Sequence, residues 1–103
     1  MNDQPLITVI LSVRNASSTL EESVLSIFNQ SYKNLEIVAI DDFSSDNSYS
    51  ILKNLKKTDK RLRVYKNVKK YGLAVTLNRL VKKAKGSYIA FMDTQDFSKQ
   101  IGT

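Results

Sequence analysis

Four short apolar runs alternate with three longer segments, and this alternation limits the folds open to the 103-residue chain more than any other feature. The runs cover residues 6–13, 35–40, 62–65 and 87–92. The first two are almost continuously apolar, which is typical of strands covered on both faces. The segments between the runs are too long for hairpins, so the pattern predicts a mostly parallel sheet with helices on both faces. We therefore expect a single α/β domain over residues 1–103, in the order β-α-β-α-β-α-β.

The segments between the runs carry helix signals. Ser18 followed by Glu21 has the spacing of a capping box and predicts the start of the first helix. Gly86 follows the third helical segment and is expected to cap its C-terminus. The third segment also has a helical apolar stripe, which we expect to pack in the core. This stripe consists of Leu73, Leu77, Leu80, Val81 and Ala84.

The chain has no Cys and no His, and this excludes several kinds of site. A disulfide framework, a thiol nucleophile, a zinc site of the usual ligands and an imidazole base are all ruled out. Catalysis must come from carboxylates, hydroxyls, Lys, Arg or a hard cation held by oxygen atoms. No apolar run approaches the roughly 20 residues that span a bilayer, and residues 1–5 do not resemble a secretory signal. We therefore expect a cytoplasmic protein.

Charge is distributed unevenly along the chain. Residues 1–52 have two basic and seven acidic side chains, whereas residues 53–103 have fourteen basic and three acidic ones. Most of the excess lies between Lys53 and Lys85. A Lys-rich segment of this kind is either a solvated face or a surface that attracts an anionic membrane or a phosphate-bearing ligand. A nucleic-acid partner is not expected, because few aromatic residues interrupt the segment and no nucleic-acid-binding motif accompanies it.

Polar residues follow the apolar runs where a parallel sheet would have its carboxyl edge. Ser12 lies near the end of the first run and Arg14 follows it directly. Asp41 and Asp42 follow the second run, residues 67–71 come after the third, and Asp93 follows the fourth. Ligands of open parallel sheets bind beyond this edge, near the point where strand order reverses. The convergence of these residues predicts a site for a polar, phosphorylated ligand.

Glycine-based phosphate binding is not expected. The sequence has neither G-x-x-x-x-G-K-[ST] nor G-x-G-x-x-G, and its only glycines are Gly72, Gly86 and Gly102. The charge of a diphosphate would therefore be met by Lys and Arg, or by a metal held on carboxylates. Mg²⁺ and Mn²⁺ prefer such hard oxygen ligands and often bridge to phosphates.

With these motifs in place, the sequence resembles family 2 glycosyltransferases of the GT-A fold, which transfer a sugar from a nucleotide-sugar to an acceptor. The resemblance covers almost the whole chain in the family's order and spacing. It rests on residues 7–15, 26–32, 35–48, 71–74 with Asn78, and 84–93. It implies a Rossmann-like, nucleotide-binding half of a GT-A domain, with a nucleotide-diphosphate sugar, such as a UDP-sugar, as its ligand.

The resemblance also implies roles for single residues. Ser12 and Arg14 stand where the family lines the nucleotide base. Asp42, with Asp41 beside it, stands where a carboxylate hydrogen-bonds the uracil or the ribose. Asp93 opens the acidic motif that approaches the ribose, the diphosphate and the metal. A carboxylate accepts hydrogen bonds from the imide N–H of uracil and from ribose hydroxyls, so the chemistry agrees.

Three positions depart from the family's pattern. Arg14 stands where an aromatic residue is usual, and Phe43 stands where Gly usually follows the Asp pair. The acidic motif reads Asp93-Thr94-Gln95-Asp96 instead of Asp-x-Asp-Asp. Asp93, Gln95 and Asp96 are therefore the expected ligands of Mn²⁺ or Mg²⁺, and the neutral Gln95 oxygen is a weaker ligand than a carboxylate.

The family also has a second half of similar size, which binds the acceptor and supplies the catalytic carboxylate. The chain ends soon after Asp96, so we expect it to be the N-terminal, donor-binding part of an inverting glycosyltransferase. The catalytic base is then unknown, and the isolated chain is expected to be inactive. The expected acceptor is a saccharide or a lipid-linked sugar in cell-wall or polysaccharide biosynthesis. The expected location is the cytoplasm, at the inner face of the membrane.

A different class of function is also compatible with the sequence. In this alternative the chain is a non-catalytic α/β module that docks on an anionic membrane surface or a partner through its Lys-rich segment. Docking of this kind would survive loss of Asp42, whereas donor binding would not.

Overall fold

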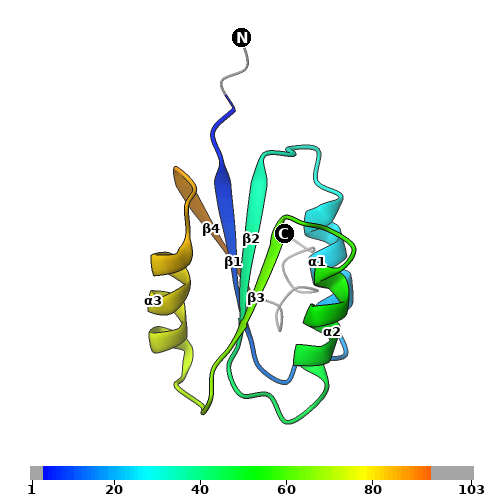
Figure 1. The fold of residues 1–103 in the computed structure, drawn as a ribbon, viewed down its shortest axis with the longest axis vertical. Coiled ribbons are helices and arrows are strands. Elements are labelled where there is room, and N and C mark those ends of the chain that lie inside the picture. The colour runs from blue at the N-terminus through cyan, green and yellow to red at the C-terminus, as the bar shows by residue number, and fades with distance from the viewer. Residues whose placement is uncertain (1–3, 94–103) are drawn as a thin grey trace.

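A computed structural model describes residues 4–93 of the chain, with side chains up to Met92. Seven elements alternate in this range, as the sequence predicts (Figure 1). The strands are β1 (Ile7–Val13), β2 (Leu35–Asp41), β3 (Leu62–Lys66) and β4 (Tyr88–Asp93). The helices are α1 (Leu20–Phe28), α2 (Ser48–Lys56) and α3 (Leu73–Lys83).

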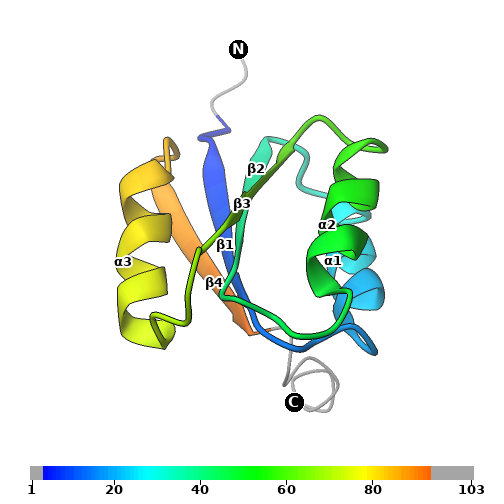
Figure 2. The ribbon, with the colours of Figure 1, turned by 60° about the horizontal axis from the view of Figure 1, so that its bottom comes forward.

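The four strands form one sheet in the order β3-β2-β1-β4, and every neighbouring pair is parallel. Helices α1 and α2 cover one face of this sheet and α3 covers the other (Figure 2). The predicted α/β class, element order and coverage of both faces are therefore confirmed. In the described part of the chain, no helix is long and apolar enough to cross a membrane.

The two faces of the sheet differ in how completely they are buried. The face under α1 and α2 has the larger core, in which Leu11, Leu20 and Leu52 are completely buried. The face under α3 has a smaller cluster of four buried residues, Ile10, Val38, Ile40 and Leu80. Both faces of β1 and β2 are thus apolar and buried, which explains the continuous apolar runs from which these strands were predicted.

The predicted apolar stripe of α3 is only partly buried, so this expectation is wrong in part. Leu80 is fully buried and Leu77 is half-buried, but Leu73 and Val81 are 55% and 47% exposed. These side chains are exposed because the described part of the sheet ends at β4. α3 packs over β1 and β2, and β4 is an edge strand within the described residues, so the β4 side of α3 has no covering element there.

Two expectations about helix caps are also wrong. α1 begins after Thr19, and no side chain caps its N-terminus, so Ser18 and Glu21 do not form a capping box. α3 ends at Lys83, and Gly86 lies beyond it as part of the turn that leads into β4. A Cβ atom at Gly86 would lie 2.7 Å from the Leu6 carbonyl oxygen and 2.8 Å from the Thr8 nitrogen. Glycine is needed there because the turn approaches β1 closely, not because it caps a helix.

The direction in which strands are added to the sheet reverses once. From β1 the chain proceeds to the adjacent β2 and then to β3 at one edge. From β3 it returns through α3 to β4, on the opposite side of β1. The reversal lies between β1 and β4, and ligands of open α/β sheets bind beyond the carboxyl ends of the strands at such a point.

Candidate functional site

The reversal point brings two of the predicted residues together. Ser12 near the end of β1 is the register partner of Asp93 at the end of β4. On the other side of β1, Val13 pairs with Asp41 at the end of β2. Ser12, Asp93 and Asp41 thus lie at the carboxyl ends of three adjacent strands, and Asp42 and Arg14 follow directly on β2 and β1. The convergence predicted from the apolar runs is present in the backbone of the fold.

The loops that follow β1 and β2 are bonded to each other across this edge. The Asn15 side-chain oxygen accepts a hydrogen bond from the Ser45 backbone N–H at 2.8 Å, and the Asn15 N–H donates to the Ser44 hydroxyl. Asn15 has a φ of 52°, which an Asn tolerates better than most residues. The Asp46 carboxylate, in the loop after β2, accepts a hydrogen bond from the Ser17 backbone N–H, in the loop after β1. These bonds hold the segment that contains Arg14 against the segment that contains Asp42.

Asp42 is the most heavily bonded acidic residue of the edge. Its Oδ1 accepts hydrogen bonds from the Asn67 side-chain amide and the Tyr71 backbone N–H, both at 2.9 Å. Its Oδ2 accepts from the Gly72 N–H, also at 2.9 Å. A carboxylate has about four acceptor positions, so one position on Oδ2 remains beyond these three donors. Gly72 has a φ of 90°, which glycine adopts readily, and it leads directly into α3.

The surroundings of Asp42 keep it ionised. The residue is only 3% exposed, and burial by itself raises the pKa of its carboxyl. The hydrogen bonds from Asn67, Tyr71 and Gly72, together with the nearby positive charge of Arg14, lower it by more, so the pKa lies below its usual range. The remaining acceptor position therefore belongs to a carboxylate, which suits an N–H or O–H donor of a ligand.

Asp41 and Asp46 are occupied by the turn between β2 and α2. The two oxygens of Asp41 accept hydrogen bonds from the backbone N–H and the hydroxyl of Ser44, and Asp41 is completely buried. Asp46 accepts from the N–H and the hydroxyl of Ser48, the first residue of α2. Slight burial raises the pKa of Asp46, but these bonds and those from Ser17 lower it to about 2. Asp41 thus stabilises the turn, and Asp46 accepts hydrogen bonds from the first residue of α2.

Phe43 occupies this turn in an unusual backbone conformation. Its φ is 63°, in the left-handed region, and half of its surface is exposed. A bulky residue there is strained, because its Cβ crowds the following carbonyl. Glycine would carry no such strain, which gives a physical reason for the preference for Gly at this position.

The predicted metal ligands fall mostly beyond the described residues. Asp93 closes β4, but its side chain, Gln95 and Asp96 lie outside what the structure describes. Within the described residues, no three Asp, Glu, His or Cys side chains are grouped as metal ligands. The oxygens of Asp41 and Asp42 are largely taken by protein donors. A metal at this edge would therefore depend on Asp93 and the residues that follow it, whose oxygen atoms are donors of the kind that Mg²⁺ and Mn²⁺ prefer.

The sequence reasoning missed the residue that connects this site to the neighbouring strand. Asn67 follows β3, is 2% exposed, and uses its amide to bond both Asp42 and the Thr76 hydroxyl. Its side-chain oxygen accepts a hydrogen bond from Arg79 at 3.1 Å. A polar residue after a strand indicated only that residues 67–71 lie near the edge, and nothing in the local pattern pointed to its partners.

Comparisons with known proteins identify the family. The sequence profile of "Glycosyl transferase family 2" matches residues 8–99. The chain belongs to glycosyltransferase family 2. The resemblance inferred from the strand-end motifs is confirmed.

Curated relatives agree with this membership. An "Uncharacterized glycosyltransferase" of Haemophilus influenzae is 41% identical over 95 residues, which cover 92% of this chain and 38% of the relative. The Escherichia coli protein "UDP-Glc:alpha-D-GlcNAc-diphosphoundecaprenol beta-1,3-glucosyltransferase WfaP" is 38% identical over 92 residues, or 89% of this chain and 36% of WfaP. The chain thus spans somewhat more than a third of the length of these relatives.

A solved structure confirms the GT-A fold. "Mannosyltransferase PcManGT from Pyrobaculum calidifontis in complex with GDP-Man and Mn2+" superimposes with a TM-score of 0.83. The two sequences are 27% identical, and the match covers 89% of this chain and 28% of the mannosyltransferase. The chain therefore shares its Rossmann-like architecture with a mannosyltransferase whose structure contains GDP-Man and Mn²⁺.

Proposed function

We propose that this chain is the donor-binding part of a glycosyltransferase and that it holds a nucleotide-diphosphate sugar, a UDP-sugar, at the reversal point between β1 and β4. One observation carries the proposal: Ser12 and Asp93 are register partners at that point, and the ionised Asp42 directly follows β2, the strand on the other side of β1. Family membership makes sugar transfer the reaction to expect, and ligands of open α/β sheets bind at such a point.

In this proposal Asp42 and Arg14 recognise the nucleoside. The free acceptor position of Asp42 takes the imide N–H of uracil or a ribose hydroxyl. Arg14 stacks on the base or pairs with a phosphate, as a guanidinium can do either. Ser12 lines the base beside them, and Asp41 supports the site by keeping the β2–α2 turn in place. The support for these roles is the position of each residue at the carboxyl edge.

The diphosphate requires a cation, because this edge is acidic. Asp41, Asp42 and Asp46 lie at this edge. The arginines of the two ion pairs among the described residues, Arg61 and Arg63, lie elsewhere and add no positive charge here. Asp93, Gln95 and Asp96 would hold Mn²⁺ or Mg²⁺, and PcManGT is a complex with Mn²⁺. A bound metal of this kind offsets the negative charge on the departing diphosphate.

The transfer itself needs more than these 103 residues. An acceptor hydroxyl oxygen bonds to the anomeric carbon of the sugar, the bond from that carbon to the phosphate oxygen breaks, and the nucleoside diphosphate leaves with the electron pair. The hydroxyl proton passes to a carboxylate base, which we place in an acceptor-binding part outside these 103 residues. Attack opposite the leaving group inverts the anomeric centre. The acceptor is a saccharide or, as the name of WfaP states for that protein, a sugar on a lipid diphosphate.

The same proposal puts the protein in the cytoplasm, at the inner face of a membrane that carries the lipid-linked acceptor. Its biological role would be cell-wall or polysaccharide biosynthesis.

Titration calorimetry tests donor binding directly. The 103-residue chain is titrated with UDP, UDP-glucose and GDP, each with and without Mn²⁺. We expect saturable binding of a uridine nucleotide that strengthens with Mn²⁺. Absence of saturable binding to every nucleoside diphosphate at millimolar concentration would contradict the proposal. Preference for GDP would keep the site but refute the choice of UDP.

A further inference from the structure

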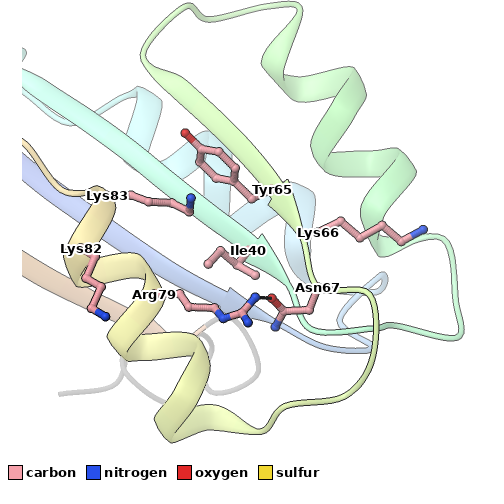
Figure 3. Close-up of a pocket in the computed structure, with 7 residues that line it drawn as sticks. All are labelled: Ile40, Tyr65, Lys66, Asn67, Arg79, Lys82 and Lys83. Atoms are coloured by element: carbon pink, nitrogen blue, oxygen red, sulfur yellow. Dashed lines mark hydrogen bonds between the residues drawn. The ribbon is translucent and has the colours of Figure 1, made fainter.

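A groove lies between α3 and β3, on the face of the sheet opposite α1 and α2 (Figure 3). It exists because α3 packs over β1 and β2 and leaves the neighbouring β3 uncovered on this face. Ile40 and Tyr65 form its floor, and Asn67, Arg79 and Lys83 reach it from the two sides. Its volume is about 430 Å³. We call it the α3–β3 groove.

The α3–β3 groove is cationic. Arg79, Lys82 and Lys83 of α3 and Lys66 of β3 line it, and no carboxylate among the described residues does. Arg79 and Lys83 are four residues apart on one helix, a spacing at which like charges repel and destabilise the helix. The two ion pairs among the described residues use Arg61 and Arg63, so no acidic partner within 4 Å relieves this repulsion.

Two of the groove cations, Arg79 and Lys83, are positioned by contacts with neighbouring side chains. The Arg79 guanidinium donates a hydrogen bond to the Asn67 side-chain oxygen at 3.1 Å and lies 4.2 Å from the centre of the Tyr71 ring. The Lys83 ammonium lies 4.0 Å from the centre of the Tyr65 ring. Asn67, which orients Arg79, is itself buried. Cations that are already ordered lose less conformational entropy when they bind an anion.

We propose that the α3–β3 groove is a binding site for a phosphate or diphosphate group, separate from the nucleotide site at the strand ends. A planar guanidinium and an ammonium that line the same groove match the oxygens of a phosphate or diphosphate group, and a multiply charged anion offsets the repulsion between Arg79 and Lys83. The groove volume lies in the range of small-ligand pockets. Asn67 joins the two sites, because it also donates to Asp42.

Pyrophosphate binding tests the groove. The 103-residue chain is titrated with inorganic pyrophosphate at low ionic strength without divalent metal. The variant Arg79→Gln/Lys83→Gln is compared with Lys56→Gln/Lys57→Gln, which loses the same charge from α2 and the residue after it. We expect binding to weaken at least tenfold in the groove variant and less than twofold in the control. Equal weakening in the two variants, or no saturable binding to the unmodified chain, overturns the proposal.

Chemical-shift mapping keeps the test decisive if the groove variant does not fold. Amide resonances of the unmodified chain are followed during the same titration. Changes centred on residues 65–67 and 79–83 support the site. Changes confined to the strand ends near Ser12 and Asp42 overturn it, since the pyrophosphate is then in the proposed nucleotide site. UDP binding in the presence of Mn²⁺ is measured separately, so the two proposals can fail independently.

A vesicle experiment identifies the source of the phosphate. Co-sedimentation is measured with phosphatidylglycerol vesicles and with phosphatidylcholine vesicles. Sedimentation with the anionic vesicles that pyrophosphate displaces, and that the groove variant loses, supports the site and assigns it to a lipid headgroup. Pyrophosphate binding without such sedimentation supports the site and assigns it to a soluble phosphate compound.

Discussion

The two ends of β2 each hold a carboxylate that ties distant segments together, but they do so in different ways. At the amino edge of the sheet, Glu36 accepts hydrogen bonds from the Thr8 hydroxyl, the Lys85 backbone N–H and the Arg63 guanidinium. Burial raises the pKa of Glu36, and these three donors lower it by more. At the carboxyl edge, Asp42 accepts hydrogen bonds from three neutral N–H donors, and the nearby positive charge of Arg14 lowers its pKa further.

The difference lies in how the charge is balanced. Glu36 forms an ion pair with Arg63 at 2.9 Å, and Arg63 also donates to the Lys83 carbonyl at the end of α3. The amino edge therefore satisfies its charges internally and connects β1, β2, β3 and α3. At the carboxyl edge, Asp42 accepts from neutral N–H groups and keeps one acceptor position, which suits this edge to a ligand. We infer that the amino edge serves stability and the carboxyl edge serves binding.

The largest expected effect comes from Asp42→Asn. An amide cannot accept all three N–H donors, so one or more buried donors lose their partner, and we expect the free energy of unfolding to fall by about 2–3 kcal/mol. UDP binding should weaken at least tenfold. Urea denaturation and calorimetry measure the two effects.

Glu36→Gln is the matched control at the other edge. It breaks the partly exposed ion pair with Arg63 and should lower the free energy of unfolding by about 1–2 kcal/mol. UDP affinity should stay within twofold of the unmodified chain. A comparable loss of UDP affinity in both variants would remove the distinction between the edges.

Gly86→Ala probes the amino edge through packing alone. The added methyl group meets backbone atoms of Leu6 and Thr8 at less than 3.0 Å, so the turn or β1 has to move. We expect a loss of about 2 kcal/mol in unfolding free energy, typical of overpacking, with UDP affinity retained. Thermal and urea denaturation give the stability. An unchanged stability would show that the close approach of this turn to β1 is unimportant.

Acid should loosen the carboxyl edge through Asp46. Its folded pKa of about 2 lies below the ordinary value of 3.8, so its stabilising effect is present above pH 3.8 and disappears as the pH falls toward about 2. The stability difference between the unmodified chain and Asp46→Asn should therefore shrink over this pH range. Urea midpoints measured at several pH values report it. A difference that stays constant across the range would contradict the lowered pKa.

The smallest effect is expected from Phe43→Gly. Relief of a left-handed φ at a bulky residue gains about 1–2 kcal/mol, and the greater freedom of glycine in the unfolded chain costs about 0.5–1 kcal/mol. We therefore expect a net gain of about 0.5 kcal/mol in unfolding free energy. Denaturation with urea is the measurement. A loss of stability would mean that the exposed Phe43 side chain makes a favourable contact at this edge.

Much of the fold could be predicted, because it depends on local patterns. The apolar runs revealed β1, β2, β3 and β4, and their lengths and spacing indicated parallel pairing. The motifs after the runs placed Ser12, Arg14, Asp41, Asp42 and Asp93 at one edge. Their binding roles, and the metal ligands Gln95 and Asp96, stay predictions. The capping box at Ser18 and the cap at Gly86 were wrong, because a short motif is outweighed by the contacts around it.

What the sequence determined by itself was the order of elements and the kind of chemistry at the strand ends, since hydrophobic periodicity and side-chain type act over a few residues. Tertiary structure alone decided which donors Asp42 and Glu36 accept, how closely Gly86 approaches β1, and that β3 stays uncovered beside α3. The Asp42 donors Asn67 and Gly72 lie 25 and 30 residues away along the chain. Such partners meet only after the sheet has assembled, so no local pattern can encode them.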